Sequence, residues 1–266
     1  MKMFLVFFVA AVSVWAQQAA GDRVNVPFSD PSRPGQLKVS LIQGGITVKA
    51  YSGKEVIIET GTPAPGRQLP APPQGMRRIV PTGSGLEVDE ANNVMTVSVG
   101  PPMHPVSLAI QAPANTSLKL NTVSGAIRVE GIQGEIEADT TNGSVTLTNV
   151  SGSAVAHALN GRVEANFLQV NPQKPMSFSS LNGAIDVTFP ADLKANVKMR
   201  SDNGEILSDF DIVTKPGPGP VVENNRSAGG RYRVRVDRTV YGTINGGGPE
   251  IQFSNFNGPI YIRKAK

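Results

Sequence analysis

Residues 124–168 read SGAIRVEGI-QGEIEADTT-NGSVTLTNV-SGSAVAHAL-NGRVEANFL, which are five consecutive blocks of nine residues. Every block has glycine at its second place and apolar residues at its fourth and sixth places, whereas the third, fifth and seventh places are mostly polar or charged. This alternation predicts a short strand with one inward face, followed by a turn, five times over. A short fixed period is typical of a stacked or winding β architecture, in which a unit buries its apolar side only against its neighbours.

Asn-Gly pairs extend the pattern beyond the five blocks. From residue 142 to residue 204 they recur at intervals of 18 to 22 residues, and an aliphatic residue follows each glycine at the second position. One circuit of the chain therefore takes about 18–22 residues, and the nine-residue blocks are half-circuits. We predict that the following residues form structural turns: Asn142, Gly143, Asn160, Gly161, Asn182, Gly183, Asn203, Gly204, Asn257 and Gly258.

The sequence predicts an all-β fold, a parallel β-helix or solenoid with coils of about 18–22 residues, wound right-handed by the crossover rule. Asn-Gly is also a hairpin signal, so an antiparallel β meander is the alternative. Two observations favour the coil. The Ser-Gly and Gln-Gly pairs at the other block boundaries are poorer starts for a type I′ turn. The spacing would also place the asparagines above one another in a parallel coil, where their side chains can form a hydrogen-bonded ladder.

Composition and length fit one main β domain. The 266 residues include 28 glycines and 21 prolines, and only 17% of the residues are charged, which favours many turns and few long helices. No segment has sustained helical periodicity. The formal charge of +4 is too small to indicate a nucleic-acid-binding protein.

The first sixteen residues resemble a secretory signal peptide. Lys2 supplies the positive start, residues 4–14 form an apolar run, and cleavage is expected after Ala16, or alternatively after Ala20. A membrane anchor is the other interpretation, but about 20 apolar residues are needed to span a bilayer. The chain has no cysteine, hence neither disulfides nor a site for lipid attachment. We expect an exported protein of the periplasm, the cell envelope or the extracellular space, with no transmembrane segment after cleavage.

The remaining chain divides into a lead-in and a repeat domain. Residues 17–36 are expected to be an irregular lead-in, and residues 37–266 a single β-repeat domain whose first strands form the opening coil or cap. A proline-rich insertion at 61–85 is predicted to lie on the surface, since so many prolines cannot occupy a central sheet; a recognition segment for a partner is the alternative. Residues 215–230 form a second predicted loop. The basic residues 263–266 would discourage pairing at the last strand edge.

Several of these segments together resemble a known family. They are residues 106–113 (VSLAIQAP), residues 118–127 (LKLNTVSGAI), the repeated Asn-Gly-x-aliphatic units, residues 242–249 (GTINGGGP) and residues 257–260 (NGPI). In this order they are similar to the bacterial putative-adhesin family of exported β-strand-repeat domains, over about residues 37–264. The resemblance implies a β-helix-like exported or envelope protein, and it implies no activity, because the family has no catalytic motif to carry across.

Motifs for catalysis or metal binding are not evident in the sequence. The nine-residue blocks lack the paired glycines and the repeated aspartate of a calcium-binding β-roll. His104 and His157 are far apart and without cysteines, so a zinc site is not expected and both are read as ordinary surface or loop residues. No Gly-x-Ser-x-Gly elbow occurs, and no helix pattern follows residues 246–248 to make a dinucleotide site. We therefore expect no catalytic residue, no cofactor and no metal.

Two sets of charged residues are candidate surface features. Alternation directs several carboxylates outward, and a pair of them could in principle cleave sugars; these are Glu130, Glu135, Glu137, Asp139 and Glu164. The second set is a candidate anionic-ligand patch formed by Arg231, Arg233 and Arg235, which alternation puts on one strand face. An envelope glycan, a lipid head group or another envelope protein would be its partner.

The sequence thus favours a non-enzymatic exported envelope protein in which a rigid β-helix serves as a scaffold or an adhesive surface. The alternative is a polysaccharide-binding or polysaccharide-cleaving β-helix protein. The oligomeric state stays open.

Overall fold

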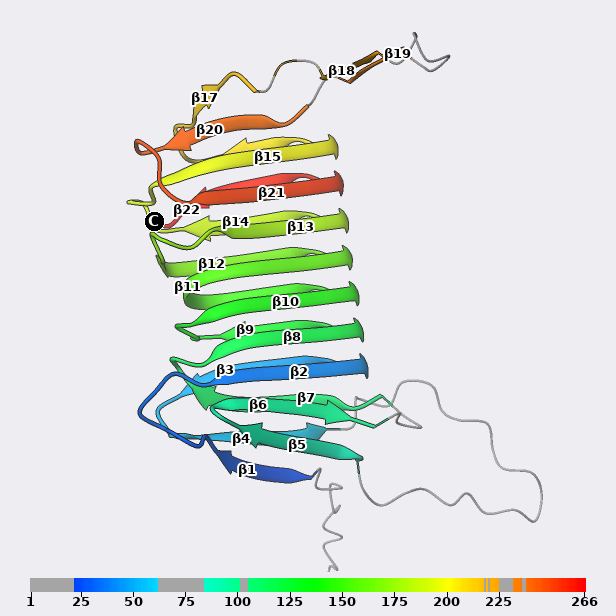
Figure 1. The fold of residues 1–266 in the computed structure, drawn as a ribbon, viewed down its shortest axis with the longest axis vertical. Helices are drawn as coiled ribbons and strands as arrows, with labels where there is room; N and C mark the ends of the chain where they lie inside the picture. Colours follow the sequence, from blue (N-terminus) through cyan, green and yellow to red (C-terminus); the bar gives the residue numbers. More distant parts are fainter. Residues whose placement is uncertain are drawn as a thin grey trace, which may run out of the picture.

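The computed structural model describes residues 22–61, 84–100, 105–217, 219, 221–224, 232–235 and 238–266. Their regular structure is β throughout, which confirms the predicted all-β class (Figure 1). Among these residues no helix is long and apolar enough to cross a bilayer. The predicted signal peptide, residues 62–83 of the proline-rich insertion, and His104 lie outside the described residues.

The strands form two sheets that face each other, and between residues 107 and 208 successive strands alternate between them, with one long strand continuing from one sheet into the other. Figure 1 shows the resulting stack of strands along the long axis of the molecule. Sheet A consists, in spatial order, of β16 (Ile206–Ser208), β22 (Ile260–Lys264), β14 (Ile185–Phe189), β12 (Val163–Val170), the first half of β11 (Val145–Asn160), β9 (Ile127–Glu130), β3 (Ile46–Tyr51), β7 (Ser107–Pro113), β4 (Glu55–Gly61) and β1 (Arg23–Pro27).

Sheet B lies opposite and is built in the same way. Its strands, in the same spatial direction, are β17 (Val213–Lys215), β20 (Val240–Ile244), β15 (Ala195–Asn203), β21 (Glu250–Asn257), β13 (Met176–Asn182), the second half of β11, β10 (Glu135–Asn142), β8 (Ser117–Ser124), β2 (Gln36–Gln43), β6 (Val94–Val99) and β5 (Leu86–Ala91). A separate hairpin pairs β18 (Val221–Asn224) with β19 (Tyr232–Arg235).

Strand pairing is parallel in the middle of the stack and antiparallel at its ends. Leu118 pairs with Ile136, 18 residues later, and Ala156 with Phe178, 22 residues later, so the predicted coil length is correct there. The expectation of one uniformly parallel coil is wrong at the ends, where β1–β4–β7, β5–β6 and β15–β20–β17 are antiparallel. A parallel coil leaves open strand edges, and these antiparallel strands cover three of the four edges among the described strands; the fourth is β16, which pairs in parallel with β22. The right-handed winding stays a prediction.

Two coils are inserted into the stack out of chain order. The coil β2–β3 lies between β6–β7 and β8–β9, and the coil β21–β22 lies between β13–β14 and β15–β16. The expectation that residues 37–50 form an end cap is therefore wrong, as is the expectation that the basic tail protects a strand edge. The lead-in is not wholly irregular either, because β1 pairs with β4. Likewise, β18 lies within the loop predicted at 215–230.

Glycine occupies one corner of the stack in coil after coil. At this corner the Cα of each glycine faces the backbone carbonyl of the adjacent coil, and a Cβ added to the glycine would approach that carbonyl oxygen closer than 3.0 Å. Gly143 faces Gly125 in this way, Gly161 faces Gly143, Gly183 faces Gly161, and Gly258 faces Gly183. Only glycine permits this approach of two backbones.

The asparagine before each of these glycines joins a ladder along the same corner. Each side-chain amide donates to the amide oxygen of its neighbour at 2.8–3.0 Å. The order is Asn142, Asn160, Asn182, Asn257 and Asn203, so the inserted last coil places Asn257 where the sequence spacing alone would place Asn203.

A column of buried or half-buried polar side chains lies one step inside the corner. Thr140, Ser180 and Ser201 donate their hydroxyls to the carbonyls of Gly125, Gly161 and Gly258 at 2.9, 3.0 and 3.2 Å. Ala158 occupies the equivalent place between Thr140 and Ser180 and has no hydroxyl to donate to Gly143.

The core between the two sheets is filled by the inward residues of every coil. Alanines such as Ala138 and Ala156 fill the middle coils, and phenylalanines fill the following ones. Phe178 of sheet B stacks on Phe253 at a ring-centroid distance of 5.5 Å, and Phe167 of sheet A stacks on Phe189 at 5.4 Å. Stacked rings on neighbouring coils fix the place of the inserted coil β21–β22.

Replacing a corner glycine should destabilise the stack. We expect Gly161→Ala to lower the free energy of unfolding by about 2–3 kcal/mol, because its Cβ would overlap the carbonyl of Gly143. Urea unfolding followed by circular dichroism measures the change. Gly61→Ala is the control, since the nearest atom to its Cβ would be 3.9 Å away; equal losses in both variants would contradict the corner constraint.

Completing the buried hydroxyl column should not destabilise the protein. We expect Ala158→Ser to leave the free energy of unfolding unchanged or to raise it by up to about 1 kcal/mol, because the new hydroxyl can donate to Gly143. Ala156→Ser, at a buried position away from the corner, should instead lower it by about 1–3 kcal/mol. Chemical unfolding of both variants decides, and a loss in Ala158→Ser as large as that in Ala156→Ser would be inconsistent with this reading.

Candidate interaction surface

The outer face of sheet B carries side chains in columns, where a column is a set of equivalent positions on neighbouring strands. Because the strands are in register, each column runs along the stack with one residue per strand, about 4.8 Å apart. The column nearest the asparagine corner is mostly apolar and is called the apolar column here; its members are Ile42, Val123, Leu159, Leu181 and Phe256, with Thr141 between Val123 and Leu159.

The apolar column is exposed rather than packed. Ile42 is 59% exposed, Val123 48%, Phe256 46% and Leu181 39%. This column was not predicted from the sequence. A signal for it is present, because each apolar member is the residue immediately before the asparagine, glutamine or serine at the corner. The alternation rule directs these side chains outward, but only the strand order shows that they stand next to one another.

The next column is polar and contains Asp139, His157 and Ser179 on three neighbouring strands. His157 Nδ1 lies 2.8 Å from the Ser179 hydroxyl. Burial raises the pKa of Asp139, and the carboxylate of Glu137 raises it further, whereas His157 and Lys119 act in the opposite direction. The three residue types are those of a hydrolytic triad, but here Ser179 contacts the Nδ1 atom that would face the aspartate in a triad.

A groove of about 780 Å³ runs along the start of the sheet B strands. Two ion pairs line it, Lys119 Nζ to Glu137 Oε1 at 2.7 Å and Lys174 Nζ to Glu135 Oε1 at 3.2 Å. Both pairs are largely solvent-exposed, so they contribute little to stability. They leave the groove polar and with charges of both signs.

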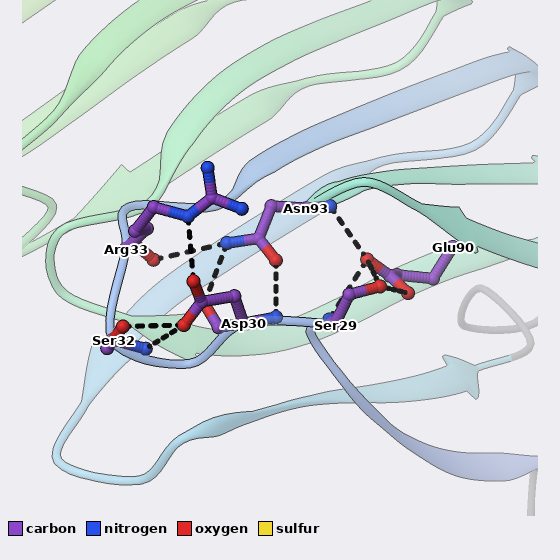
Figure 2. Close-up of polar contacts among 6 residues, drawn as sticks. All are labelled: Ser29, Asp30, Ser32, Arg33, Glu90 and Asn93. Atoms are coloured by element: carbon purple, nitrogen blue, oxygen red, sulfur yellow. Dashed lines mark hydrogen bonds and ion pairs between the residues drawn. The ribbon is translucent and has the colours of Figure 1, made fainter.

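Figure 2 shows a polar cluster of six residues, of which Arg33 and Asn93 also line this groove. Asn93, in the tight β5–β6 turn with φ 64°, donates to the Asp30 carbonyl at 2.7 Å and accepts from the Asp30 amide at 2.6 Å. The Glu90 carboxylate accepts from the Ser29 amide and hydroxyl and from the Asn93 amide. The cluster joins the segment after β1 to the β5–β6 hairpin, so it holds the end of the stack together.

These hydrogen bonds lower the pKa values of two carboxylates in the cluster, Glu90 and Asp30. The Ser29 hydroxyl, followed by the Ser29 amide, holds the pKa of Glu90 below its ordinary value. The Ser32 hydroxyl and amide, and then Arg33, do the same for the pKa of Asp30. Charged carboxylates are therefore the forms that the cluster stabilises.

A second, smaller hollow of about 330 Å³ lies on the outer face of sheet A. A bulge at Asn149, which has φ 52°, breaks the register between β11 and β12 beside it. Glu164 and Asp186 are register partners on β12 and β14 and line the hollow. Asp186 is held by Arg263 through two bonds of 2.7 and 3.1 Å, and Arg263 also lies over the Tyr261 ring.

The outward carboxylates predicted from the sequence are spread over both sheets. Glu130 pairs with Lys49 at 2.8 Å on sheet A, Glu135 and Glu137 pair with lysines on sheet B, and Glu164 lies in the sheet A hollow. In the part of the chain that the structure describes, no group of histidine and carboxylate side chains is arranged to hold a metal ion.

The candidate arginine patch lies largely beyond the described residues. Arg231 is outside them, and Arg233 and Arg235 belong to β19, whose backbone pairs with β18 so that Arg233 lies opposite Glu223. The predicted strand is present, and the patch itself stays a prediction.

Acidification should weaken the polar cluster. The folded-state pKa of Glu90 is lowered, so its stabilisation is complete above the ordinary value of 4.5 and is lost as the pH falls through the lower folded-state pKa. We expect Glu90→Gln to destabilise the protein near neutral pH and the difference from wild type to shrink in acid. Urea unfolding at several pH values measures it. Glu87→Gln on the same strand is the control, and a Glu90→Gln effect that stays constant into acid would contradict the assignment.

Comparison with known proteins gives the family and two similar structures. The family model described as Toastrack DUF4097 matches residues 25–239, and no curated protein matches the chain. A solved structure described as a putative cell adhesion protein from Clostridium sporogenes ATCC 15579 is 9% identical, covering 92% of this chain and 100% of that one with a TM-score of 0.42. One described as a putative adhesin from Bacteroides fragilis NCTC 9343 is 11% identical, covering 92% and 96% with a TM-score of 0.39. The predicted family resemblance is confirmed, and the chain belongs to the Toastrack DUF4097 family.

Proposed function

We propose that this protein is a non-enzymatic, exported scaffold of the cell envelope that binds a macromolecular partner through the outer face of sheet B. The observation that carries the proposal is the apolar column, which stays exposed on a surface whose side chains are held in register by the stack. Contiguous exposed apolar side chains beside polar ones are typical of protein interaction surfaces.

The geometry of sheet B supports binding rather than catalysis. Backbone amides of the central strands are used in the parallel ladders, so the row of Asp139, His157 and Ser179 has no pair of free amides nearby to stabilise an oxyanion. Its titratable groups lie on an open sheet face, whereas catalytic groups are usually enclosed in a pocket. The two similar structures are described as adhesion proteins, and an adhesive role for this chain is part of the proposal. The support for that role is the exposed apolar column of sheet B and not the similarity of the folds.

A polysaccharide-active protein is the second candidate, and the sheet A hollow favours it. Glu164 and Asp186 place two carboxylates on neighbouring strands in a polar depression. Against this, Arg263 binds Asp186 through both of its carboxylate oxygens, which leaves that group poorly suited to transfer protons.

One experiment separates the two candidates. The purified mature protein is incubated with isolated envelope material and with a panel of polysaccharides, and both binding and the release of reducing ends are measured. We expect binding without turnover. Turnover that disappears in Glu164→Gln or Asp186→Asn would overturn the proposal in favour of the enzyme.

Export provides a further test. We expect the protein expressed in a bacterium to accumulate outside the cytoplasm with Gln17 as its first residue, or Gly21 if cleavage follows Ala20. Intact-mass measurement of the fractionated protein decides between the two sites. An uncleaved cytoplasmic product would contradict the exported location.

A basic patch on β19 would allow the protein to bind an anionic ligand as well. If Arg231, Arg233 and Arg235 form the patch, replacing all three with alanine should reduce binding to anionic envelope polymers by about tenfold or more. Replacing Arg23, Arg128 and Arg162, which are exposed, with alanine removes the same three positive charges and serves as the control. Binding that is equal in the two triple variants would remove the patch.

A further inference from the structure

We propose that the partner of sheet B's outer face is a second copy of this chain, bound face to face with a twofold axis along β13. The proposal rests on the proposed function, because both require this face to be a binding surface. It goes further by naming the occupant and the register.

The charge pattern of the face is self-complementary about β13. Two strands to one side lies β10, with outward Glu137 and Asp139, and two strands to the other side lies β15, with outward Lys198 and Arg200. A twofold axis along β13 reverses the stack, so β10 of one copy faces β15 of the other. Asp139 then faces Arg200, and Glu137 faces Lys198. Charges of opposite sign meet twice in each half of the interface.

The apolar column is self-complementary about the same axis. Leu181 lies on β13 and faces its own copy, while Leu159 on β11 faces Phe256 on β21. The residues between the apolar column and the groove on β13 are Ser177 and Ser179. Small side chains at the centre allow the two sheets to approach to the spacing of about 10 Å that stacked sheets adopt.

Two neighbouring registers bring like charges close to the axis. If the axis is moved to β11, Lys38 of β2 faces Lys198 of β15, and if it lies between β11 and β13, Lys119 of β8 faces Lys198. With the axis on β13, the like-charged pair is Lys38 and Lys215 of β17, four strands from the axis and outside the seven strands centred on β13. Like charges inside an interface select against the first two registers, so the one about β13 is favoured among the three.

Within one copy the charges of His157 and Lys119 act favourably on the Asp139 carboxylate, but neither forms a direct bond to it. This carboxylate forms no hydrogen bond or ion pair with a described residue, although it is partly buried on the sheet surface. Arg200 is held by Asp202 at 3.0 Å but remains half exposed, so it can reach a second carboxylate. An arginine commonly binds carboxylates through more than one of its five donors.

The face is large enough for a stable dimer. Seven strands centred on β13, from β8 to β20, span about 29 Å along the stack, and an eight-residue strand spans about 26 Å. Their product, roughly 750 Å², is close to the roughly 800 Å² that each partner contributes to a standard protein interface.

Single cysteines provide the most direct test, because the chain has no cysteine of its own. Leu181→Cys places two thiols opposite each other across the twofold axis. Sheets about 10 Å apart hold the two Cα atoms beyond the reach of a direct disulfide, so a short bis-maleimide cross-linker should link most of the mature protein into a dimer. Leu168→Cys on sheet A, where the leucine is 58% exposed, is the matched control and should remain monomeric under the same conditions. Cross-linking that is equal in both variants would overturn the proposal.

Charge exchange tests the register. In sedimentation velocity we expect wild type to show a concentration-dependent dimer and Leu181→Glu to be a monomer. Asp139→Arg and Arg200→Asp should each raise the dimer dissociation constant at least about tenfold when alone. Mixed in equal amounts, they should dimerise again, because both charge pairs are then of opposite sign in the mixed dimer. This recovery also shows that each variant is folded.

The outcomes for the two proposals are distinguishable. A wild-type chain that stays monomeric at every concentration, or a mixture of the two charge variants that fails to dimerise, overturns the twofold pairing. If such a monomer still binds isolated envelope material, the scaffold function stands with a different partner.

Discussion

The close approach of two backbones at the glycine corner is the constraint on which the rest of the structure depends. At this corner the carbonyl of one coil points at the Cα of the next, as between Gly143 and Gly161, and no Cβ fits. The same carbonyls accept the hydroxyls of Thr140 and Ser180 from inside the stack, and the asparagines before the glycines form their ladder outside it. Steric and hydrogen-bonding requirements thus converge on one edge and fix the register of every central coil.

Fixed register also arranges the outward side chains of both sheets in columns. Because each outward side chain has an equivalent on the neighbouring strand, similar side chains can be repeated along the stack. A contact that is weak for one residue is then made several times. The apolar column is one result, and the charged positions of β10 and β15 on either side of β13 are another. A surface of this kind suits the recognition of a large, flat partner better than the enclosure of a small molecule.

At both ends of the stack, most of the strand edges that a parallel coil would expose are paired with further strands. Antiparallel strands cover both edges of sheet B and the β1 edge of sheet A, whereas the short parallel strand β16 forms the other edge of sheet A. At the β1 end the cluster around Asn93 and Glu90 joins the segment after β1 to a hairpin. In addition, the coils β2–β3 and β21–β22 occupy interior positions. The first parallel coil and the last are consequently paired on both sides and cannot fray as terminal coils would.

The local repeat could be read from the sequence because its causes are local. Alternation decides which residues point inward, and glycine is required wherever two backbones touch, so the strands, the half-circuits and the coil length of 18–22 residues around residues 124–182 follow from the residues themselves. The outward direction of Asp139 and His157 follows in the same way. The regularity of the blocks is a consequence of packing and carries no information on catalysis.

The order of the coils and the composition of the surface were decided only by the tertiary structure. Any coil with this pattern presents the same backbone hydrogen bonds to its neighbour, so the pattern does not specify which coil lies next to which. The stacking of Phe253 on Phe178, 75 residues apart in sequence, selects β21 as the neighbour of β13. For that reason Asn257 precedes Asn203 in the ladder, and Phe256 joins Leu181 in the apolar column. The sequence alone determined the strand, the turn and the coil, whereas long-range packing determined which side chains share a face.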